Sequence, residues 1–333
     1  MSREKNIAIV GATGAVGVEM LRCLEQRNFP HAGIKALASA RSAGKELPYR
    51  GGSVLVEELT PESFQGVDIA LFSAGSGISK EFGPIAARAG AVVIDNSSAF
   101  RMDETVPLVV PEINPEDAMK HQGIIANPNC TTIITLMALN PLHQRFGVRR
   151  LIASSYQAVS GSGAQGIAEL ESQVRSIAAG EKPIRSVYQH QIAFNVIPHV
   201  DVFLENGYTK EEMKMVHEGR KILHHPELQA SVTCVRVPVY RSHSVSVTVD
   251  FAEMPDVDEA RRVINAAPGV HVVDDPSQLL YPTPLDSTNG DDCLVGRIRR
   301  DLVFDNGLAF WVVGDQVRKG AALNAVQIAE LFV

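Results

Sequence analysis

The sequence lacks the cysteine patterns that build disulfide frameworks and zinc sites. Its four cysteines stand at positions 23, 130, 234 and 293, with no Cys-x-x-Cys pair among them. Scattered single cysteines are typical of proteins in a reducing compartment. We therefore expect a cytoplasmic protein that binds no metal.

Long apolar runs and basic charge are also in short supply. The first apolar run, residues 7–10, is too short for the core of a signal peptide, and no run approaches the ~20 residues of a membrane helix. No internal repeat or low-complexity tract is present. A net charge of −7 argues against nucleic acid as the main partner, although it allows a local basic pocket.

What is present describes an ordinary globular protein. The chain has 333 residues, of which 45% are hydrophobic and 21% charged. Domains commonly run to ~100–200 residues, so this length predicts two domains with substantial cores.

One short stretch, residues 126–132, contains the most informative cysteine. Asn-Pro-Asn favours a turn, Asn129 is a good helix N-cap, and residues 133–139 predict a helix that meets no proline before Pro141. Cys130 then lies in the first turn, where unpaired N–H groups and the helix dipole favour an anion. Such a position activates thiols as nucleophiles. A small buried hydrophobe is the alternative, and placement alone leaves both open.

The N-terminal residues predict a dinucleotide-binding loop. An apolar strand over residues 6–10 leads into Gly-Ala-Thr-Gly-Ala-Val-Gly and then into a helix in which Cys23 is expected to be core. Glycines let the backbone approach a pyrophosphate, which the helix N-terminus then binds. The spacing is GxxGxxG, a variant of the usual motif. The candidate cofactor contacts are Gly11, Thr13, Gly14, Ala15, Val16 and Gly17.

The end of the next strand bears on the choice of cofactor. Residues 34–38 predict a strand that ends in Ser39, Arg41 and Ser42, with no acidic side chain for a ribose 2′-hydroxyl. Two hydroxyls and an arginine suit a 2′-phosphate, so we expect NADP rather than NAD. A solvated loop is the alternative interpretation.

Further strands over residues 67–72 and 91–95, separated by a helix over residues 79–88, predict a parallel, doubly wound sheet. Ser73, Ala74 and Gly75 follow one strand at its carboxyl end, where such sheets bind ligands. Arg101 lies just beyond the other strand, and we expect it to bind an anion.

Five motifs together carry a family resemblance. They are GATGAVG at 11–17, Ser-Ala-Gly at 73–75, DNSSAFR at 95–101, VPEIN at 110–114 and NPNCTT at 127–132. On these motifs the chain resembles the aspartate-semialdehyde dehydrogenases, most closely the shorter bacterial type, from end to end. The related N-acetyl-glutamyl-phosphate reductases share the architecture but differ around the cysteine, and they remain an alternative. A non-catalytic NADP-binding sensor is a second alternative, from a different class.

The resemblance implies an NADP-dependent phosphorylating aldehyde dehydrogenase. NADPH would reduce L-aspartyl 4-phosphate to L-aspartate 4-semialdehyde through a cysteine thioester, in lysine, threonine, methionine and isoleucine biosynthesis. It also implies a Rossmann-type domain, residues 1–129 with 315–333. The catalytic and dimer-forming α+β domain, residues 130–314, would be similar to the C-terminal domain of glyceraldehyde-3-phosphate dehydrogenase. A homodimer is expected.

The resemblance also implies roles for individual residues. Cys130 is the nucleophile, His243 the acid/base, and Gln157 an orienting group. The remaining expected contacts are Arg236 and Glu211 for the amino-acid end; Arg101, Asn129 and Lys214 for phosphate; and Ser160, Gly161 and Gln316 for the cofactor.

Local patterns around some of these residues favour plainer interpretations. Thr209 and Glu212 form a capping-box pattern at the start of a helix, and Glu211 with Lys214 would by themselves indicate an exposed ion pair. Residues 231–250 predict one long or broken strand pair. Within a straight strand, positions 236 and 243 face opposite sides, so both reach one pocket only if Pro238 marks a bend. His243 alone would suit a histidine at the edge of the core.

Near the C-terminus, residues 294–304 and 308–313 flank Asp-Asn-Gly, a strong hairpin signal. Residues 320–331 predict an apolar helix, which the resemblance places back on the nucleotide domain.

Overall fold

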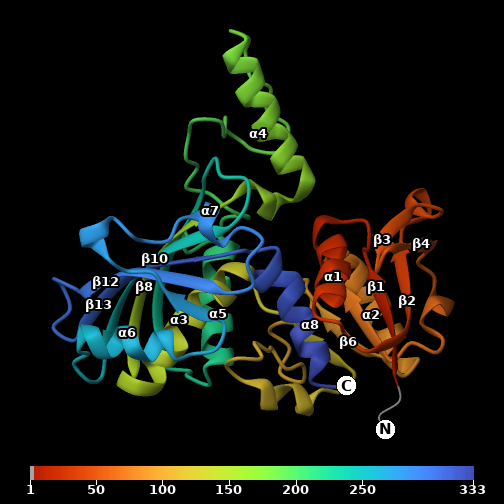
Figure 1. Ribbon diagram of the computed structural model, residues 1–333, viewed down its shortest axis with the longest axis horizontal. Coiled ribbons are helices and arrows are strands. Elements are labelled where there is room, and N and C mark those ends of the chain that lie inside the picture. The colour runs from red at the N-terminus through yellow and green to blue at the C-terminus, as the bar shows by residue number, and fades with distance from the viewer. Residues whose placement is uncertain (1–3) are drawn as a thin grey trace. The chain divides into compact units, whose positions relative to one another are not determined.

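The computed structural model describes residues 4–333, which fall into two compact units. The first unit comprises the chain up to Asn129 together with Ala321–Val333, and the second comprises Cys130–Gly320. The domain boundary proposed from sequence, between residues 314 and 315, lies a few residues before this division. Figure 1 shows both units coloured along the chain.

The first unit contains a seven-stranded sheet in the order β3-β4-β2-β1-β5-β6-β7. Every neighbouring pair is parallel except β3 with β4, so the predicted doubly wound sheet is confirmed. The strands are β1 Lys5–Val10, β2 His31–Ala38, β3 Glu46–Tyr49, β4 Gly52–Glu58, β5 Ile69–Phe72, β6 Val92–Asp95 and β7 Ile124–Ala126.

Helices cover both faces of this sheet because its central strands are apolar on both sides. In β1, Ile7 and Ile9 pack on one face, while Ala8 and Val10 pack on the other. The α-helices are α1 Ala15–Gln26, α2 Ser76–Arg88 and α8 Leu323–Glu330, and the short 3₁₀ turns are η1 Ala40–Ser42, η2 Pro61–Phe64 and η3 Pro115–Lys120. As predicted, α8 packs in the nucleotide unit, in the same apolar cluster as Cys23 of α1.

The second unit is built on a mixed six-stranded sheet in the order β11-β12-β13-β10-β8-β9. The outer pairs β8–β9 and β11–β12 are parallel, and the three inner pairs are antiparallel. The strands are β8 Val148–Gln157, β9 Gln229–Arg236, β10 His243–Phe251, β11 Val270–Val272, β12 Cys293–Arg300 and β13 Gly307–Gly314.

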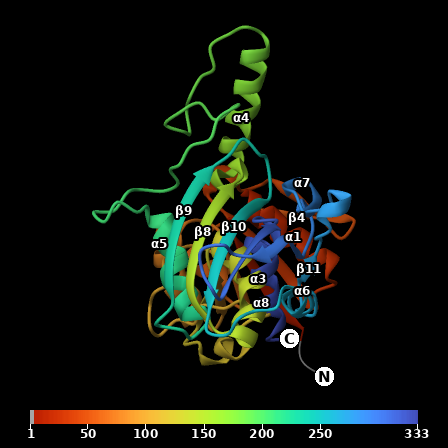
Figure 2. The same ribbon diagram turned by 90° about the vertical axis from the view of Figure 1, so that its left-hand side faces the viewer.

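The helices of this unit have different relations to the sheet. They are α3 Cys130–Phe146, α4 Gly163–Ala178, α5 Lys210–Ile222, α6 Val257–Asn265 and α7 Pro284–Ser287, with 3₁₀ turns η4 Val159–Ser162 and η5 Pro276–Gln278 and the π-helix η6 Arg318–Ala322. Residues 131–139 of α3 are all buried, so α3 is the central core helix. It continues past Pro141. Figures 1 and 2 show α4 projecting away from the sheet.

Two strand predictions need correction. Residues 231–250 form two strands, β9 and β10, that are not neighbours, because β8 lies between them. The C-terminal hairpin pairs β12 with β13 as expected, but β12 ends at Arg300 and not at residue 304. The carboxylate of Asp301 accepts the backbone N–H groups of Val303 and Phe304 and so turns the chain earlier.

One face of this sheet is partly open. It is the face opposite the one on which β8 buries Leu151, Ala153 and Ser155. Ile152 is 49% exposed and Tyr156 37% exposed, while Ser246 and Thr248 are half-buried. Among residues 4–333, none of the helices combines the length and apolar composition needed to cross a bilayer.

Candidate active site

Three predicted site residues form one row across the second unit's sheet. Gln157 of β8 pairs with Arg236 of β9 on one side. On the other side Tyr156 pairs with Ser244 of β10, which places His243 beside Gln157. All three side chains are buried, at 6% exposure or less. Arg236 and His243 therefore reach one face from separate strands, and the bend demanded of Pro238 is unnecessary.

Cys130 begins α3, as the turn before it predicted, and this helix packs on β8, β10 and β13. The thiol is half-buried. Burial first, and then the nearby charges of Glu211, Glu212 and Cys130, raise the pKa of Cys234 to about 12 against a hydrogen bond to Ser155. α3 packs on β8 and β10, two of the three strands that carry the row.

Glycine 320 allows the close approach of η6 to Cys130. A Cβ built at Gly320 would lie 2.8 Å from the Cys130 Cβ and 3.3 Å from its Cα. The segment is a π-helix, a rare conformation that often accompanies functional sites. The backbone at this position therefore limits where the sulfur can lie.

The backbone of Ala158 holds two of the row residues. Its N–H donates to Nδ1 of His243 at 3.1 Å, and its carbonyl accepts from Nη1 of Arg236 at 2.8 Å. Because Nδ1 accepts a hydrogen bond, the neutral imidazole carries its proton on Nε2. That nitrogen is buried and has no hydrogen-bond partner within residues 4–333. Burial and then Arg236 hold the pKa of His243 well below its usual value.

Gly161 faces the same two side chains. A Cβ at this position would lie 2.8 Å from Nη1 of Arg236 and 3.4 Å from Nε2 of His243. The η4 turn that carries Gly161 is tied down by Ser160, whose N–H donates to the carbonyl of Tyr240. A side chain at position 161 would therefore push directly on the row.

A chain of charged groups continues from Gln157. Its Nε2 donates to Oε1 of Glu211 at 3.2 Å, and Lys214 donates to Oε2 of Glu211 at 2.9 Å. Lys214 also donates to Asp201 at 2.9 Å. The capping box of Thr209 and Glu212 that starts α5 is confirmed. Glu211 and Lys214 form a largely buried ion pair and not an exposed one, since Glu211 is only 7% exposed.

Gln316 links the turn at Ser160 to the start of β10. Its Oε1 accepts from the N–H of Ser242 at 2.7 Å, and its Nε2 donates to Oγ of Ser160. Ser242 has a left-handed φ of 73°, and it directly precedes His243. Both ends of the Gln316 amide are therefore used in holding these two segments.

In the first unit, the glycine loop fits a bound pyrophosphate. A Cβ at Gly11, whose φ is +84°, would lie 2.4 Å from the Ser73 carbonyl oxygen, and one at Gly17 would lie 2.3 Å from the Gly11 carbonyl oxygen. Gly14 occupies the N-cap of α1 without a side-chain hydrogen bond, which leaves the first amides of the helix accessible to a phosphate. Thr13, Ala15 and Val16 complete the turn.

The loop lies where the strand order reverses. β1 has β2 on one side and β5 on the other, so the turns after β1 and β5 flank the crevice in which doubly wound sheets bind dinucleotides. Ser73, Ala74 and Gly75 follow β5, and Gly75 has a φ of +86°. At the end of β2, Ser39 and Arg41 are exposed and Ser42 is buried in η1.

The candidate anion residue of the first unit is held by backbone carbonyls. Arg101 donates through Nε to Asn127 at 2.9 Å and through Nη2 to Asn96 at 2.8 Å. Its side chain is only 7% exposed, as is that of Asn129. Arg101 is thus a rigid, buried cation near the carboxyl end of β6.

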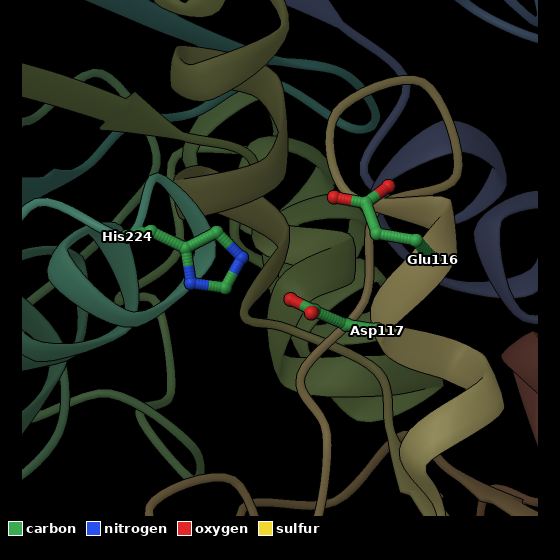
Figure 3. A group of neighbouring side chains, drawn as sticks. All are labelled: Glu116, Asp117 and His224. Carbon is green, nitrogen blue, oxygen red and sulfur yellow. The ribbon is translucent and has the colours of Figure 1, made fainter.

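Figure 3 draws three further titratable residues, Glu116, Asp117 and His224. Glu116 and Asp117 lie in η3 of the first unit, whereas His224 follows α5 in the second. Asp117 is already engaged within its own unit by Lys120 at 2.6 Å and Asn114 at 2.8 Å.

Sequence patterns pointed to neither Ala158 nor Asp201. Ala158 acts through its backbone, which no side-chain motif reports. Asp201 lies 13 residues before Lys214, in an irregular segment outside α5, so no helical or strand spacing links the two.

Two family models match the chain. Residues 6–121 match a model described as "Semialdehyde dehydrogenase, NAD binding domain", and residues 139–319 match "Semialdehyde dehydrogenase, dimerisation domain".

Similar proteins cover nearly the whole chain. The aspartate-semialdehyde dehydrogenase of Aquifex aeolicus is 53% identical over 98% of this chain and 97% of its own. That of Bacillus subtilis is 50% identical over 99% and 98%. Aspartate semialdehyde dehydrogenase II of Vibrio cholerae, solved in complex with ASA, superposes with a TM-score of 0.97 at 45% identity over 99% and 98%. The enzyme of Candida albicans, solved with NADP, gives 0.77 at 26% over 99% and 98%.

A dinucleotide-binding unit followed by a dimerisation domain with a buried polar row defines a nicotinamide-dependent oxidoreductase. On the family models and the relatives together, the chain belongs to the aspartate-semialdehyde dehydrogenase family. The family, the fold class and the enzyme class predicted from the sequence are confirmed.

Proposed function

We propose that this protein catalyses the reversible, NADPH-dependent reductive dephosphorylation of L-aspartyl 4-phosphate to L-aspartate 4-semialdehyde. The observation that carries the proposal is the row of Arg236, Gln157 and His243 on the sheet against which α3 places Cys130. The activity named for the relatives supports the same substrate.

In this reaction the chain supplies the nucleophile, and the substrate supplies the phosphate that leaves. Sγ of Cys130 bonds to the acyl carbon, and the bond from that carbon to the phosphate oxygen breaks, which leaves a thioester and free phosphate. NADPH supplies the hydride that reduces the thioester carbon. The carbon–sulfur bond then breaks to release the aldehyde and regenerate the thiolate.

His243 is suited to donate a hydrogen bond or proton from Nε2, since Nδ1 is occupied by the Ala158 N–H. The planar fork of Arg236 suits the α-carboxylate of the substrate, and Glu211 suits its α-ammonium group. Gln157 orients these groups through Glu211. Arg101, Asn129 and Lys214 are the proposed phosphate contacts.

The cofactor contacts are proposed on chemical fit. The open N-terminus of α1 suits the pyrophosphate, and Arg41 with Ser39 suits a 2′-phosphate at a strand end that offers no acidic side chain. Ser160 and Gly161 are proposed for the nicotinamide end, with Gln316 supporting Ser160.

The test is absorbance at 340 nm with aspartate semialdehyde, phosphate and NADP. Phosphate-dependent NADPH formation is expected from the wild type and from Cys23→Ala, a matched control in the core of α1, and none from Cys130→Ala. Activity in Cys130→Ala would overturn the nucleophile. A wild type that is inactive here but active on N-acetylglutamate semialdehyde would overturn the substrate.

A second variant tests the anion site. Arg101→Ala is expected to raise the phosphate KM strongly while the protein stays folded. A normal phosphate KM in this variant would reject the role proposed for Arg101.

A thiol-reactive probe separates an enzyme from a sensor, because only an enzyme needs one cysteine that reacts unusually fast near neutral pH.

We also propose a homodimer and a cytoplasmic location. The domain description and the partly open sheet face support a homodimer, which light scattering would detect at twice the 36.0 kDa chain mass. A cytoplasmic location suits a reaction that needs Cys130 reduced, and all four cysteines are thiols. Fractionation of the producing cells tests it.

A further inference from the structure

Lys214 lies between two carboxylates. Its Nζ is 2.9 Å from Oδ2 of Asp201 and 2.9 Å from Oε2 of Glu211. The side chain of Lys214 is 17% exposed, that of Glu211 is 8% and that of Asp201 is 30%. One ammonium group and two carboxylates sum to one negative charge, so the cluster by itself repels an anion.

The opposite charges in this cluster stabilise one another when no substrate is bound. A largely buried ammonium group is costly unless it is paired. Although burial opposes it, pairing with Glu211 and Asp201 raises the pKa of Lys214. Burial alone would raise the pKa of Asp201, but Lys214 and the N–H of Val202 lower it overall. Both shifts favour the charged forms of Lys214 and Asp201.

The two carboxylates differ in how firmly they are held. Glu211 belongs to α5, three residues before Lys214, and its other oxygen accepts from Gln157 in the catalytic row. Asp201 lies in an irregular segment, has a left-handed φ of 68°, and is the more exposed of the two. Within residues 4–333, its other oxygen accepts only from the neighbouring N–H of Val202, at 2.8 Å. Asp201 is the partner that Lys214 can exchange.

We propose that Asp201 is an exchangeable counter-ion of Lys214, which phosphate displaces when it binds, and that Asp201 thereby sets the affinity for phosphate. This inference rests on the proposed function, in which Lys214 contacts phosphate. An incoming phosphate takes over the ammonium donor that Asp201 releases, while Glu211 keeps the other donor and stays in place for the substrate ammonium group. No covalent bond changes in this exchange.

The test is Asp201→Asn, which removes the charge but keeps the size and an acceptor oxygen. Without the competing carboxylate, the phosphate KM is expected to fall by about threefold or more, a size typical of partly exposed ion pairs. The KM values for aspartate semialdehyde and NADP should stay within about twofold of the wild type. A gain in phosphate affinity cannot arise from a damaged fold, so it separates this role from a merely structural one.

Glu205→Gln is the matched control. Glu205 lies in the same segment and is exposed, and within residues 4–333 the ion pairs of Lys214 are with Asp201 and Glu211 instead. Glu205→Gln removes the same charge from the same region but leaves the ion pair of Lys214 with Asp201 in place. A smaller fall in phosphate KM than for Asp201→Asn is therefore expected. If Asp201→Asn is insoluble, Asp201→Ser is measured with the same criterion.

The outcomes separate the two proposals. A wild type without phosphate-dependent activity would remove the proposed function itself. An active wild type with an unchanged or raised phosphate KM in Asp201→Asn would remove only the counter-ion role. Equal falls in phosphate KM for Asp201→Asn and Glu205→Gln would show that the loss of any negative charge in this segment has the same effect. That result would also reject the counter-ion role of Asp201.

Discussion

The backbone N–H of Ala158 donates to Nδ1 of His243, and this single 3.1 Å contact decides which ring nitrogen is available for chemistry. The side chain of His243 is fully buried, so solvent cannot compete for either nitrogen. The carbonyl of the same residue accepts from Nη1 of Arg236. A shift of Ala158, which directly follows β8, is therefore expected to move both the imidazole and the guanidinium group together.

Acid should destabilise the protein partly through His243. Its folded-state pKa is lowered by burial and by Arg236, so below about pH 6.5 the unfolded chain binds a proton that the folded chain does not. The stability present above that pH is thus lost as the pH falls. The free energy of unfolding, measured in urea at about pH 7.5 and 5.5, should fall more for the wild type than for His243→Asn. Equal falls would show that His243 takes no part.

Gly161→Ala should damage the substrate site. The added methyl group would meet Nη1 of Arg236 at 2.8 Å, so the guanidinium group must shift. Misplacement of a positioning group by about 1 Å commonly costs up to about 100-fold in rate. We expect kcat/KM for aspartate semialdehyde to fall at least about tenfold. Gly219→Ala is the control, because its Cβ would make an ordinary 3.6 Å contact with Leu228. Wild-type kcat/KM in Gly161→Ala would contradict the crowding argument.

Gly320→Ala should displace the sulfur of Cys130. The new Cβ would lie 2.8 Å from the Cys130 Cβ, in a backbone segment that has little room to yield. The expected result is a fall of roughly tenfold or more in both kcat and the rate of Cys130 alkylation. Iodoacetamide labelling, followed by mass spectrometry of the Cys130 peptide, measures the second quantity. Retention of both rates would show that η6 does not constrain the thiol.

Thr209→Ala should weaken the start of α5. The hydroxyl accepts from the N–H of Glu212, and the loss of such a cap costs about 1 kcal/mol. Because Glu211 and Lys214 lie in the first turns of this helix, the KM values for semialdehyde and phosphate should rise as well. Urea unfolding measures the loss of stability, and initial rates measure the two KM values. Thr209→Ser keeps the acceptor, so it should behave like the wild type; if it lost as much stability as Thr209→Ala, the cap would not be the cause.

Local patterns predicted the parts of the site that depend on short stretches of chain. The glycine loop before α1, the turn that starts α3 at Cys130 and the capping box of Thr209 each lie within a few residues. Their geometry follows from backbone sterics and from unpaired helix-terminal groups, which neighbouring residues determine.

Long-range pairing was not predictable in this way. The chain from Gln229 to Phe251 looked like one strand pair, yet β8 inserts between β9 and β10. Hydrophobic alternation reports which residues share a face, but it does not report which strand lies next to which. Alternation along one straight strand therefore predicts opposite sides for Arg236 and His243, although both lie beside Gln157.

By itself the sequence determined the family, the two kinds of domain and the residue types of the chemistry, because motifs and periodicity are local properties of the chain. The tertiary structure alone decided the row of Arg236, Gln157 and His243, the proton position on that histidine, and the pairing of Lys214 with Asp201. These depend on burial and on contacts between separate elements, from 13 residues apart for Lys214 and Asp201 to 85 for Ala158 and His243. Such contacts exist only once the sheet has formed.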